Sequence, residues 1–110
     1  TTRLDPQYAN AYHARGLAYD NLGQSERAIQ DFDEAIRLNP QYANAYYDRG
    51  FAAYQLGQYE RAIHDYDEAI RLNPQYAVAY YNRGFAYDDL GMTEMAERNF
   101  QKAKELGYNP

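Results

Sequence analysis

The sequence predicts an all-α protein, an α-solenoid of three helix-turn-helix repeats, and three observations support this fold class. Pro6, Pro40 and Pro74 stand 34 residues apart, each within a Leu-(Asp/Asn)-Pro-Gln-Tyr-Ala segment. Residues 9–42 and 43–76 are identical at 25 of 34 positions without a gap. Apolar residues follow helical spacing between these prolines. A period of this length is typical of stacked arrays whose units bury one continuous core together.

Each repeat is predicted to contain two helices. Between Gln7 and Leu22, apolar and small residues recur every three or four positions, as on one face of an amphipathic helix. Gly23 is expected to end this helix, because glycine readily adopts the left-handed conformation that closes one. A second helix is expected over residues 25–38, and it ends at Asn39 because the residue before a proline is pushed out of the helical region. The same signals recur twice more, so three antiparallel helix pairs are predicted.

The period also sets the expected boundaries. The chain of 110 residues is predicted to form a single domain, 1–110, with repeats at about 9–42, 43–76 and 77–110. Residues 1–8 resemble the tail of an upstream repeat. Small residues recur where the two helices of a pair are expected to cross closely. They are Gly16, Gly50 and Gly84 in the first helices, and Ala28, Ala62 and Ala96 in the second.

An arginine precedes the packing glycine of every repeat. An anion-binding ladder is one interpretation, but this position points toward the neighbouring helix, where an aspartate recurs. A partly buried arginine is tolerated mainly when a carboxylate accepts its hydrogen bonds. Asn99 replaces the carboxylate in the third repeat, so Arg83 is expected to be held less firmly or to find another partner. The predicted ion pairs are Arg15 with Asp31 and Arg49 with Asp65.

The repeats share a long motif at fixed spacing. An aromatic residue is followed four positions later by glycine, then by an alanine, an aromatic and another alanine of the second helix, with a closing proline in the first two repeats. The aromatic positions are Tyr12, Tyr46 and Tyr80, then Phe32, Tyr66 and Phe100; the later alanines are Ala35, Ala69 and Ala103.

This motif resembles the tetratricopeptide repeat (TPR) family, and it covers nearly the whole chain. The arginine before the glycine, where the family usually has leucine, resembles the Asn-Arg-Gly type of bacterial and archaeal members. The resemblance implies a right-handed superhelix whose first helices line a concave groove that holds an extended peptide or a helix of a partner. The sequence comparison agrees, because six of the nine differences between the first two repeats fall in the first helix.

The predicted groove residues lie on one face of the first helices, at steps of three and four. The centre of this face is aromatic and its borders are acidic, so a protein or peptide with apolar anchors and basic flanks is the expected partner. Packing of individual rings against the next repeat is an equally good interpretation. The residues are Asn10, His13, Leu17, Asp20, Asn44, Tyr47, Asp48, Phe51, Tyr54, Val78, Tyr81, Asn82, Phe85 and Asp88.

Several classes of partner are expected to be excluded. The resemblance implies Lys, Asn and Arg on this face in the repeats that grip the carboxylate of chaperone tails, whereas this chain has other residues there. The net charge of −5 and a pI near 4.9 argue against nucleic acid. No apolar run is long enough to span a membrane and no signal peptide is visible, although one could precede Thr1. The absence of cysteine leaves the cellular compartment open.

Catalytic chemistry is not expected, and neither is a cofactor. His13 and His64 lie in different repeats without a nucleophile in the sequence around them. Glu60 and Glu68 flank His64 by one turn, but a solvated helix surface is a better explanation than a metal site. The recurring cluster of residues 31, 33 and 34 resembles paired carboxylates for acid–base work. Its repetition argues against a catalytic pair and favours a solvated surface with local pairing.

The two ends of the array predict different surfaces. Glu97 and Lys104 stand where the other repeats have isoleucine, as expected for a polar terminal face that no further repeat covers. At the other end, an uncovered first helix would expose Tyr12, Tyr19 and nearby apolar atoms. Self-association through stacked terminal faces, giving a homo-oligomer, is therefore the alternative to peptide binding.

Overall fold

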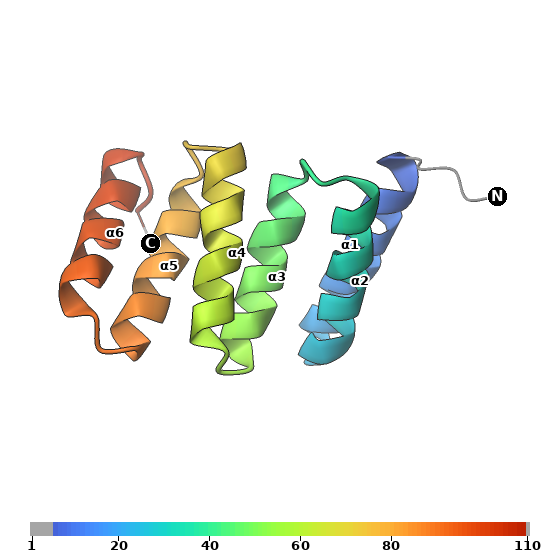
Figure 1. Cartoon of the computed structure of the whole chain (residues 1–110), viewed down its shortest axis with the longest axis horizontal. Helices are drawn as coiled ribbons and strands as arrows, with labels where there is room; N and C mark the ends of the chain where they lie inside the picture. The colour runs from blue at the N-terminus through green and yellow to red at the C-terminus, as the bar shows by residue number, and fades with distance from the viewer. Residues whose placement is uncertain (1–5, 110) are drawn as a thin grey trace.

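The computed structural model describes residues 6 to 109, and every regular element in this range is an α-helix. The helices form antiparallel pairs, α1 with α2, α3 with α4 and α5 with α6, which stand side by side in a row (Figure 1). The predicted all-α solenoid is confirmed, and the predicted bounds of the first two helices differ from the observed ones by at most one residue. Thr1–Asp5, most of the predicted upstream tail, and Pro110 lie outside the described residues. The helices are α1 (Pro6–Asn21), α2 (Ser25–Leu38), α3 (Ala43–Gln55), α4 (Tyr59–Leu72), α5 (Ala77–Asp89) and α6 (Thr93–Glu105).

A glycine turn joins the two helices of each pair. Gly23 has a φ of 77°, in the left-handed region, and the N–H of Gln24 donates to the Tyr19 carbonyl at 2.9 Å. Gly57 and Gly91 both have a φ of 78°. This geometry satisfies carbonyls at the end of the first helix and turns the chain back along it, as the sequence predicts.

Within each pair, an aromatic ring packs directly on the glycine of the first helix. A Cβ atom placed on Gly16, Gly50 or Gly84 would lie 2.6, 2.9 or 2.7 Å from the Cε1 atom of the facing ring. These separations are shorter than real carbon contacts, so no side chain fits there without a shift. The predicted close crossing of the helices is confirmed. The facing rings belong to Phe32, Tyr66 and Phe100, respectively.

Successive pairs pack through the second helix of one repeat and the first helix of the next. Ala45 and Ala52 of α3, like Ala79 and Ala86 of α5, have 0% exposure, because α2 and α4 cover them. Glu97 and Lys104 are exposed at the α6 end, as expected for a polar terminal face. The core is therefore a continuous layer that follows the row of helices, and it leaves the outward faces of the first helices free to vary.

Tyr66 is the largest fully buried side chain in the described part of the protein, with 0% exposure. Its hydroxyl is buried and has no hydrogen-bond partner among residues 6–109. Burial, with a smaller effect from neighbouring tyrosines and aspartates, raises the pKa of this hydroxyl far above its ordinary value. A buried hydroxyl without a partner loses its hydration and gains no bond in return.

Removing this hydroxyl is expected to stabilise the fold. Tyr66→Phe should raise the free energy of unfolding by about 1 kcal/mol, because the desolvation cost of the hydroxyl disappears while the ring contact with Gly50 stays. Phe32→Tyr is the matched reverse change, since Phe32 occupies the same place in the first repeat and has 0% exposure. It should lower the stability. Urea unfolding measures both, and a Tyr66→Phe variant less stable than the parent protein would contradict the assignment.

Candidate protein-binding surfaces

The predicted arginine–aspartate pairs form, and they are bidentate. Arg15 donates to Asp31 through Nε at 2.9 Å and Nη2 at 2.7 Å. Arg49 donates to Asp65 in the same way, at 3.0 and 2.7 Å. The guanidinium groups therefore face the second helix of their own repeat, and the interpretation as an anion-binding ladder is set aside. The Asp31 and Asp65 residues are 5% and 1% exposed, so their charges depend on these pairs.

A second set of aspartates joins neighbouring repeats. Asp33 of α2 accepts a hydrogen bond from Nη1 of Arg49 at 2.9 Å, and Asp67 of α4 accepts one from Nη1 of Arg83 at 2.7 Å. Arg83 also donates to Asn99 at 2.7 Å. Of the two outcomes expected for Arg83, the structure therefore shows the second, another partner in the preceding repeat.

The carboxylate cluster predicted as a solvated surface needs a correction. Asp31 and Asp65 are buried against arginines instead of lying in solvent, because the helix crossing brings the guanidinium group over them. Glu34 pairs with Arg37, and Glu68 with Arg71, one turn away on the same helix. Local pairing is thus confirmed only for the glutamates.

The predicted groove residues all lie on α1, α3 and α5, and the row of first helices brings neighbouring sets together. None is fully buried. Leu17 and Phe85, the apolar residues at the two ends of the set, are 36% and 38% exposed. The exposed members are Asn10, Leu17, Asn44, Phe85 and Asp88; the half-buried members are His13, Asp20, Tyr47, Asp48, Phe51, Tyr54, Val78, Tyr81 and Asn82.

Several of these polar side chains bond to the next repeat. His13 Nε2 lies 2.6 Å from Asp48 Oδ2, and its Nδ1 lies 3.0 Å from the hydroxyl of Tyr42. An ionised carboxylate only accepts, so in the tautomer that fits both contacts of a neutral ring Nε2 donates to Asp48 and Nδ1 accepts from the Tyr42 hydroxyl. Asn82 donates to the hydroxyl of Tyr47 one repeat back. These bonds fix the polar edges of the face.

The rings at the centre of the face pack between structural elements. Tyr47 lies 5.6 Å from Tyr66 and 5.1 Å from Tyr76, measured between ring centroids. Tyr81 lies 4.7 Å from Tyr108 and 5.6 Å from Phe100. At these two positions, packing against neighbouring elements therefore covers much of the surface of each ring. The residues with free apolar surface are Leu17 and Phe85 instead.

The electrostatics of this face are negative. Burial first, and the nearby charge of Asp48 with it, raises the pKa of Tyr47 to about 12. Burial likewise raises the pKa of Asp20, with a contribution from Asp48. The pKa of Tyr54 rises to about 12 through burial and its hydrogen bond to Asp89. Asp48 thus adds to the shifts of Tyr47 and Asp20, and Asp89 adds to that of Tyr54, although burial is the largest cause of each.

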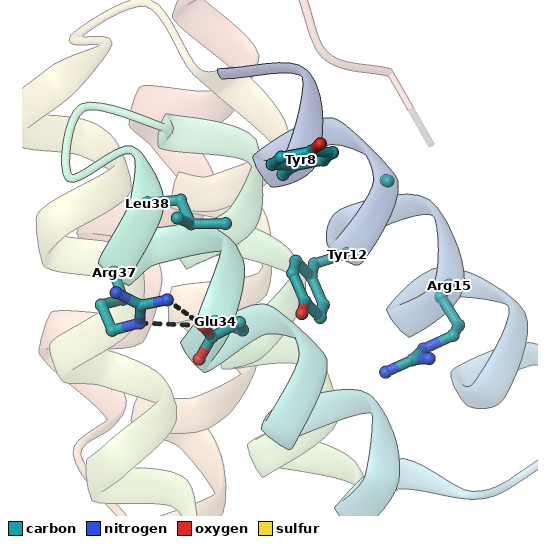
Figure 2. A pocket seen from close by; sticks show the side chains of 7 residues that line it. Tyr8, Tyr12, Arg15, Glu34, Arg37 and Leu38 are labelled. Carbon is teal, nitrogen blue, oxygen red and sulfur yellow. Dashed lines mark hydrogen bonds and ion pairs between the residues drawn. The ribbon is translucent and has the colours of Figure 1, made fainter. Parts of the chain in front are cut away.

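A pocket of ≈ 480 Å³ lies at the α1–α2 edge of the array, away from the predicted groove. Figure 2 shows Tyr8, Tyr12 and Arg15 of α1 on one side and residues of α2 on the other, with Glu34 paired to Arg37. The lining is largely apolar. It is formed by Tyr8, Ala11, Tyr12, Arg15, Glu34, Arg37 and Leu38.

Neither a metal centre nor a membrane span is present in the part of the chain that the structure describes. No group of three or more His, Asp or Glu side chains there is arranged to hold a metal ion. None of the helices formed by residues 6–105 is long and apolar enough to cross a bilayer. His64 is exposed on α4.

The row of helix pairs and its variable first-helix face define a class of protein-interaction module that is generally non-enzymatic. The chain belongs to the tetratricopeptide repeat family. A family model described as TPR repeat matches residues 21–57 and 52–91. Two others, both described as Tetratricopeptide repeat, match residues 1–30 and 77–106. Comparison with curated proteins gives no significant match.

Solved structures agree with this family. MamA is 34% identical, with a TM-score of 0.88, and the match covers 93% of this chain but only 60% of the MamA chain. The first TPR of Spaghetti (RPAP3), bound to the HSP90 peptide SRMEEVD, is 27% identical with a TM-score of 0.93, over 96% of this chain and 84% of that one. The Arabidopsis OM64 TPR domain is 26% identical with a TM-score of 0.92, over 93% of this chain and 84% of that one.

Some residues of these surfaces escape the sequence prediction. Asp33 and Asp67 follow the 34-residue period and bond to an arginine of the next repeat. Tyr42 and Tyr76 follow the same period and contact His13 and Tyr47 of their own repeats. The recurrence of these residues in the sequence indicates a structural role. It does not show whether the contact lies within one repeat or between two repeats. Asp89 bonds to Tyr54 of the preceding repeat without any counterpart at the period.

The two aspartates of Arg49 are expected to differ in their effect on stability. Asp65→Ala should lower the free energy of unfolding by about 3 kcal/mol, because it leaves a guanidinium group with 18% exposure without its buried partner. Asp33→Ala should cost at most about 1 kcal/mol, since the Asp33 side chain is 50% exposed. Asp65→Asn is the conservative control, because Asn99 fills the same place. Equal losses for Asp33→Ala and Asp65→Ala in urea unfolding would contradict this difference.

Proposed function

We propose that the chain is a protein-binding scaffold that holds a peptide or partner segment with apolar anchors and basic flanks on the α1, α3 and α5 face. The observation that carries the proposal is a charge imbalance. These three helices carry four aspartates and three arginines, and every arginine is bonded to the second helices. On the partner-facing side, therefore, no arginine of α1, α3 or α5 neutralises the aspartates of these helices. They are Asp20, Asp48, Asp88 and Asp89.

The apolar anchors of the partner would contact a row of apolar side chains to which each repeat contributes one residue. Leu17, Phe51 and Phe85 occupy equivalent positions 34 residues apart, and the two outer ones are exposed. An apolar row beside carboxylates favours a segment in which Leu, Ile or aromatic residues are flanked by Lys or Arg. The carboxylates would attract the basic flanks, and the apolar row would supply most of the affinity.

The RPAP3 neighbour supports a peptide ligand in general but not its charge. The peptide bound to that protein, SRMEEVD, has three acidic residues among its last four. At the places where chaperone-tail binders carry Lys, Asn and Arg, this chain has His13, Leu17, Asp48, Val78 and Asn82. We therefore assign this chain a ligand of the opposite charge.

Self-association through stacked ends is the alternative, and it lacks a matching surface at one end. The residues that α2 and α4 present to the next repeat are replaced in α6 by Glu97, Gln101 and Lys104. Charged and amide groups at these places would lose hydration on stacking without gaining a fitted contact. Peptide binding is therefore the better-supported function.

A random peptide library tests the proposed face. Hits on the parent protein should combine apolar residues with Lys or Arg, and a Leu17→Ser, Phe85→Ser double variant should bind them at least about tenfold more weakly. Both side chains are partly exposed, but the Phe85 ring also packs on Phe100, so circular dichroism and urea unfolding must show that the double variant stays folded. Asp88→Asn should weaken binding about threefold and reduce its salt dependence. Calorimetric titration at two salt concentrations measures both effects.

Leu22→Ser with Leu90→Ser is the matched control, because these leucines are 71% and 38% exposed at the turns. It should leave affinity unchanged. The proposed site is wrong if the hits bind the Leu17→Ser, Phe85→Ser variant as tightly as the parent. The proposed ligand charge is wrong if SRMEEVD binds saturably at physiological salt.

A further inference from the structure

The middle repeat departs from the 34-residue period at two positions on facing helices. Residue 66 of α4 is tyrosine, where the equivalent residues of α2 and α6 are phenylalanine. Residue 54 of α3 is tyrosine, where the equivalent residues of α1 and α5 are aspartate. Tyr54 packs against the apolar cluster that contains Tyr66. Both exceptions therefore belong to one packed group, and each adds a phenol hydroxyl that the other two repeats lack at that position.

The hydroxyl of Tyr66 lies just beneath the α1, α3 and α5 face. It is the one buried side-chain polar atom within residues 6–109 that has no hydrogen-bond partner. The partly buried residues that pack on its cluster are Tyr47 and Tyr54, and the Tyr47 ring centroid lies 5.6 Å from that of Tyr66. After burial, the same two tyrosines contribute most to the raised pKa of Tyr66, so its hydroxyl end lies toward them. A single layer of half-buried side chains therefore separates this hydroxyl from the partner-facing surface.

The two covering tyrosines are held differently. Tyr47 packs between two rings of its own repeat and accepts a hydrogen bond from α5. The hydrogen bond of Tyr54 to Asp89 lies at the exposed surface, where water can replace it at little cost. Changes of side-chain rotamer are common when an interface forms. Tyr54 is therefore the side chain that moves aside most easily, and its movement uncovers the hydroxyl of Tyr66.

The surroundings of this hydroxyl favour a neutral polar group on an apolar stem. Burial raises the pKa of Tyr66, so the hydroxyl stays protonated and can both donate and accept. The other members of its cluster are alanines with 0% exposure, beside which a charged group would lose its hydration. The nearby carboxylates, Asp48 and Asp65, already bond to other side chains. A hydroxyl or an amide would give Tyr66 a partner without burying a new charge.

We propose that Tyr66 is a specificity-determining residue of the α1, α3 and α5 face, and that it selects a partner segment whose central anchor ends in a neutral hydroxyl or amide, as Tyr and Gln do. The anchor displaces the Tyr54 side chain and forms a hydrogen bond with the Tyr66 hydroxyl. This inference rests on the proposed function, because it names the anchor that the middle repeat prefers. The anchors over Leu17 and Phe85 remain apolar.

The hydroxyl therefore acts in opposite directions on folding and on binding. Without a ligand it is unpaired, so Tyr66→Phe should raise the urea midpoint of the protein. With the ligand it is paired, so the same change should weaken binding of a peptide with a central Tyr. A site that bonds a ligand hydroxyl rejects the analogue without it, because its own polar group is then left unpaired. A purely structural role of Tyr66 would leave the preference between the two peptides unchanged.

Peptides that differ only at the central anchor test the proposal. The tightest library hit supplies the frame, with its outer apolar anchors and basic flanks fixed, and the central residue is Tyr, Phe, Gln, Met or Lys. On the parent protein, replacing the central Tyr by Phe should weaken binding about tenfold, and replacing Gln by Met should have a similar effect. On the Tyr66→Phe variant, the Tyr and Phe peptides should bind within about twofold of each other. Calorimetric titration completes this double-mutant cycle.

Two further variants separate the hydroxyl from other effects. Phe32→Tyr is the matched control, because it adds a hydroxyl at the equivalent place of the first repeat, and it should leave the preference at the central anchor unchanged. Tyr54→Ala removes the cover, so it should keep the preference for Tyr over Phe without lowering affinity. Circular dichroism and urea unfolding establish that each variant is folded.

Three results would overturn the role of Tyr66. They are equal affinity of the parent for the Tyr and Phe peptides, a preference for Tyr that persists in Tyr66→Phe, and a Lys peptide that binds more tightly than the Tyr and Gln peptides. In each case the hits would still depend on Leu17 and Phe85, so the proposed function would stand. A library without any hit that depends on these two residues would overturn both proposals.

Discussion

The arginine of each interior repeat ties three helices together, and the rest of the array depends on this contact. Arg49 binds Asp65 of its own repeat, 16 residues later, and Asp33 of the preceding repeat, 16 residues earlier. Because Asp65 is almost fully buried, its charge is tolerated only while the guanidinium group stays in place. The contact therefore joins the two helices of one repeat and the second helix of the preceding repeat at a single guanidinium group.

This arrangement separates structural positions from binding positions. The arginines, the glycines under aromatic rings and the buried alanines all face the second helices, so they are constrained in every repeat. The opposite face of the first helices meets the second helices only in part, through rings such as Tyr47 on Tyr66, and there the residues differ from repeat to repeat. The same arrangement takes all three arginines away from the aspartates of the first helices, which leaves that face acidic without any change in the fold.

Much of the fold follows from local signals in the sequence. Helical periodicity and Gly23 predict the first helix pair to within one residue, and the residues flanking Arg15 and Asp31 predict their ion pair because both lie in one hairpin. The contacts between repeats are harder to predict from the sequence. Asp33 reads as an exposed helix residue, and only the tilt of one hairpin against the next brings it to Arg49. Tyr47 and Tyr81 also pack on Tyr76 and Tyr108, which follow the second helix of the same repeat, so the predicted aromatic surface is smaller than its ring count suggests.

Native-state hydrogen exchange measures the effect of the covering helix most directly. The first helices α3 and α5 each pack between two second helices, whereas among the described elements α1 packs on one second helix, α2. We expect the central amides of α1 to exchange at least about tenfold faster than those of α3, through openings that do not require global unfolding. Equal protection of the central amides in α1, α3 and α5 would show that the preceding second helix contributes nothing to holding a first helix, and would contradict the central role of stacking between repeats.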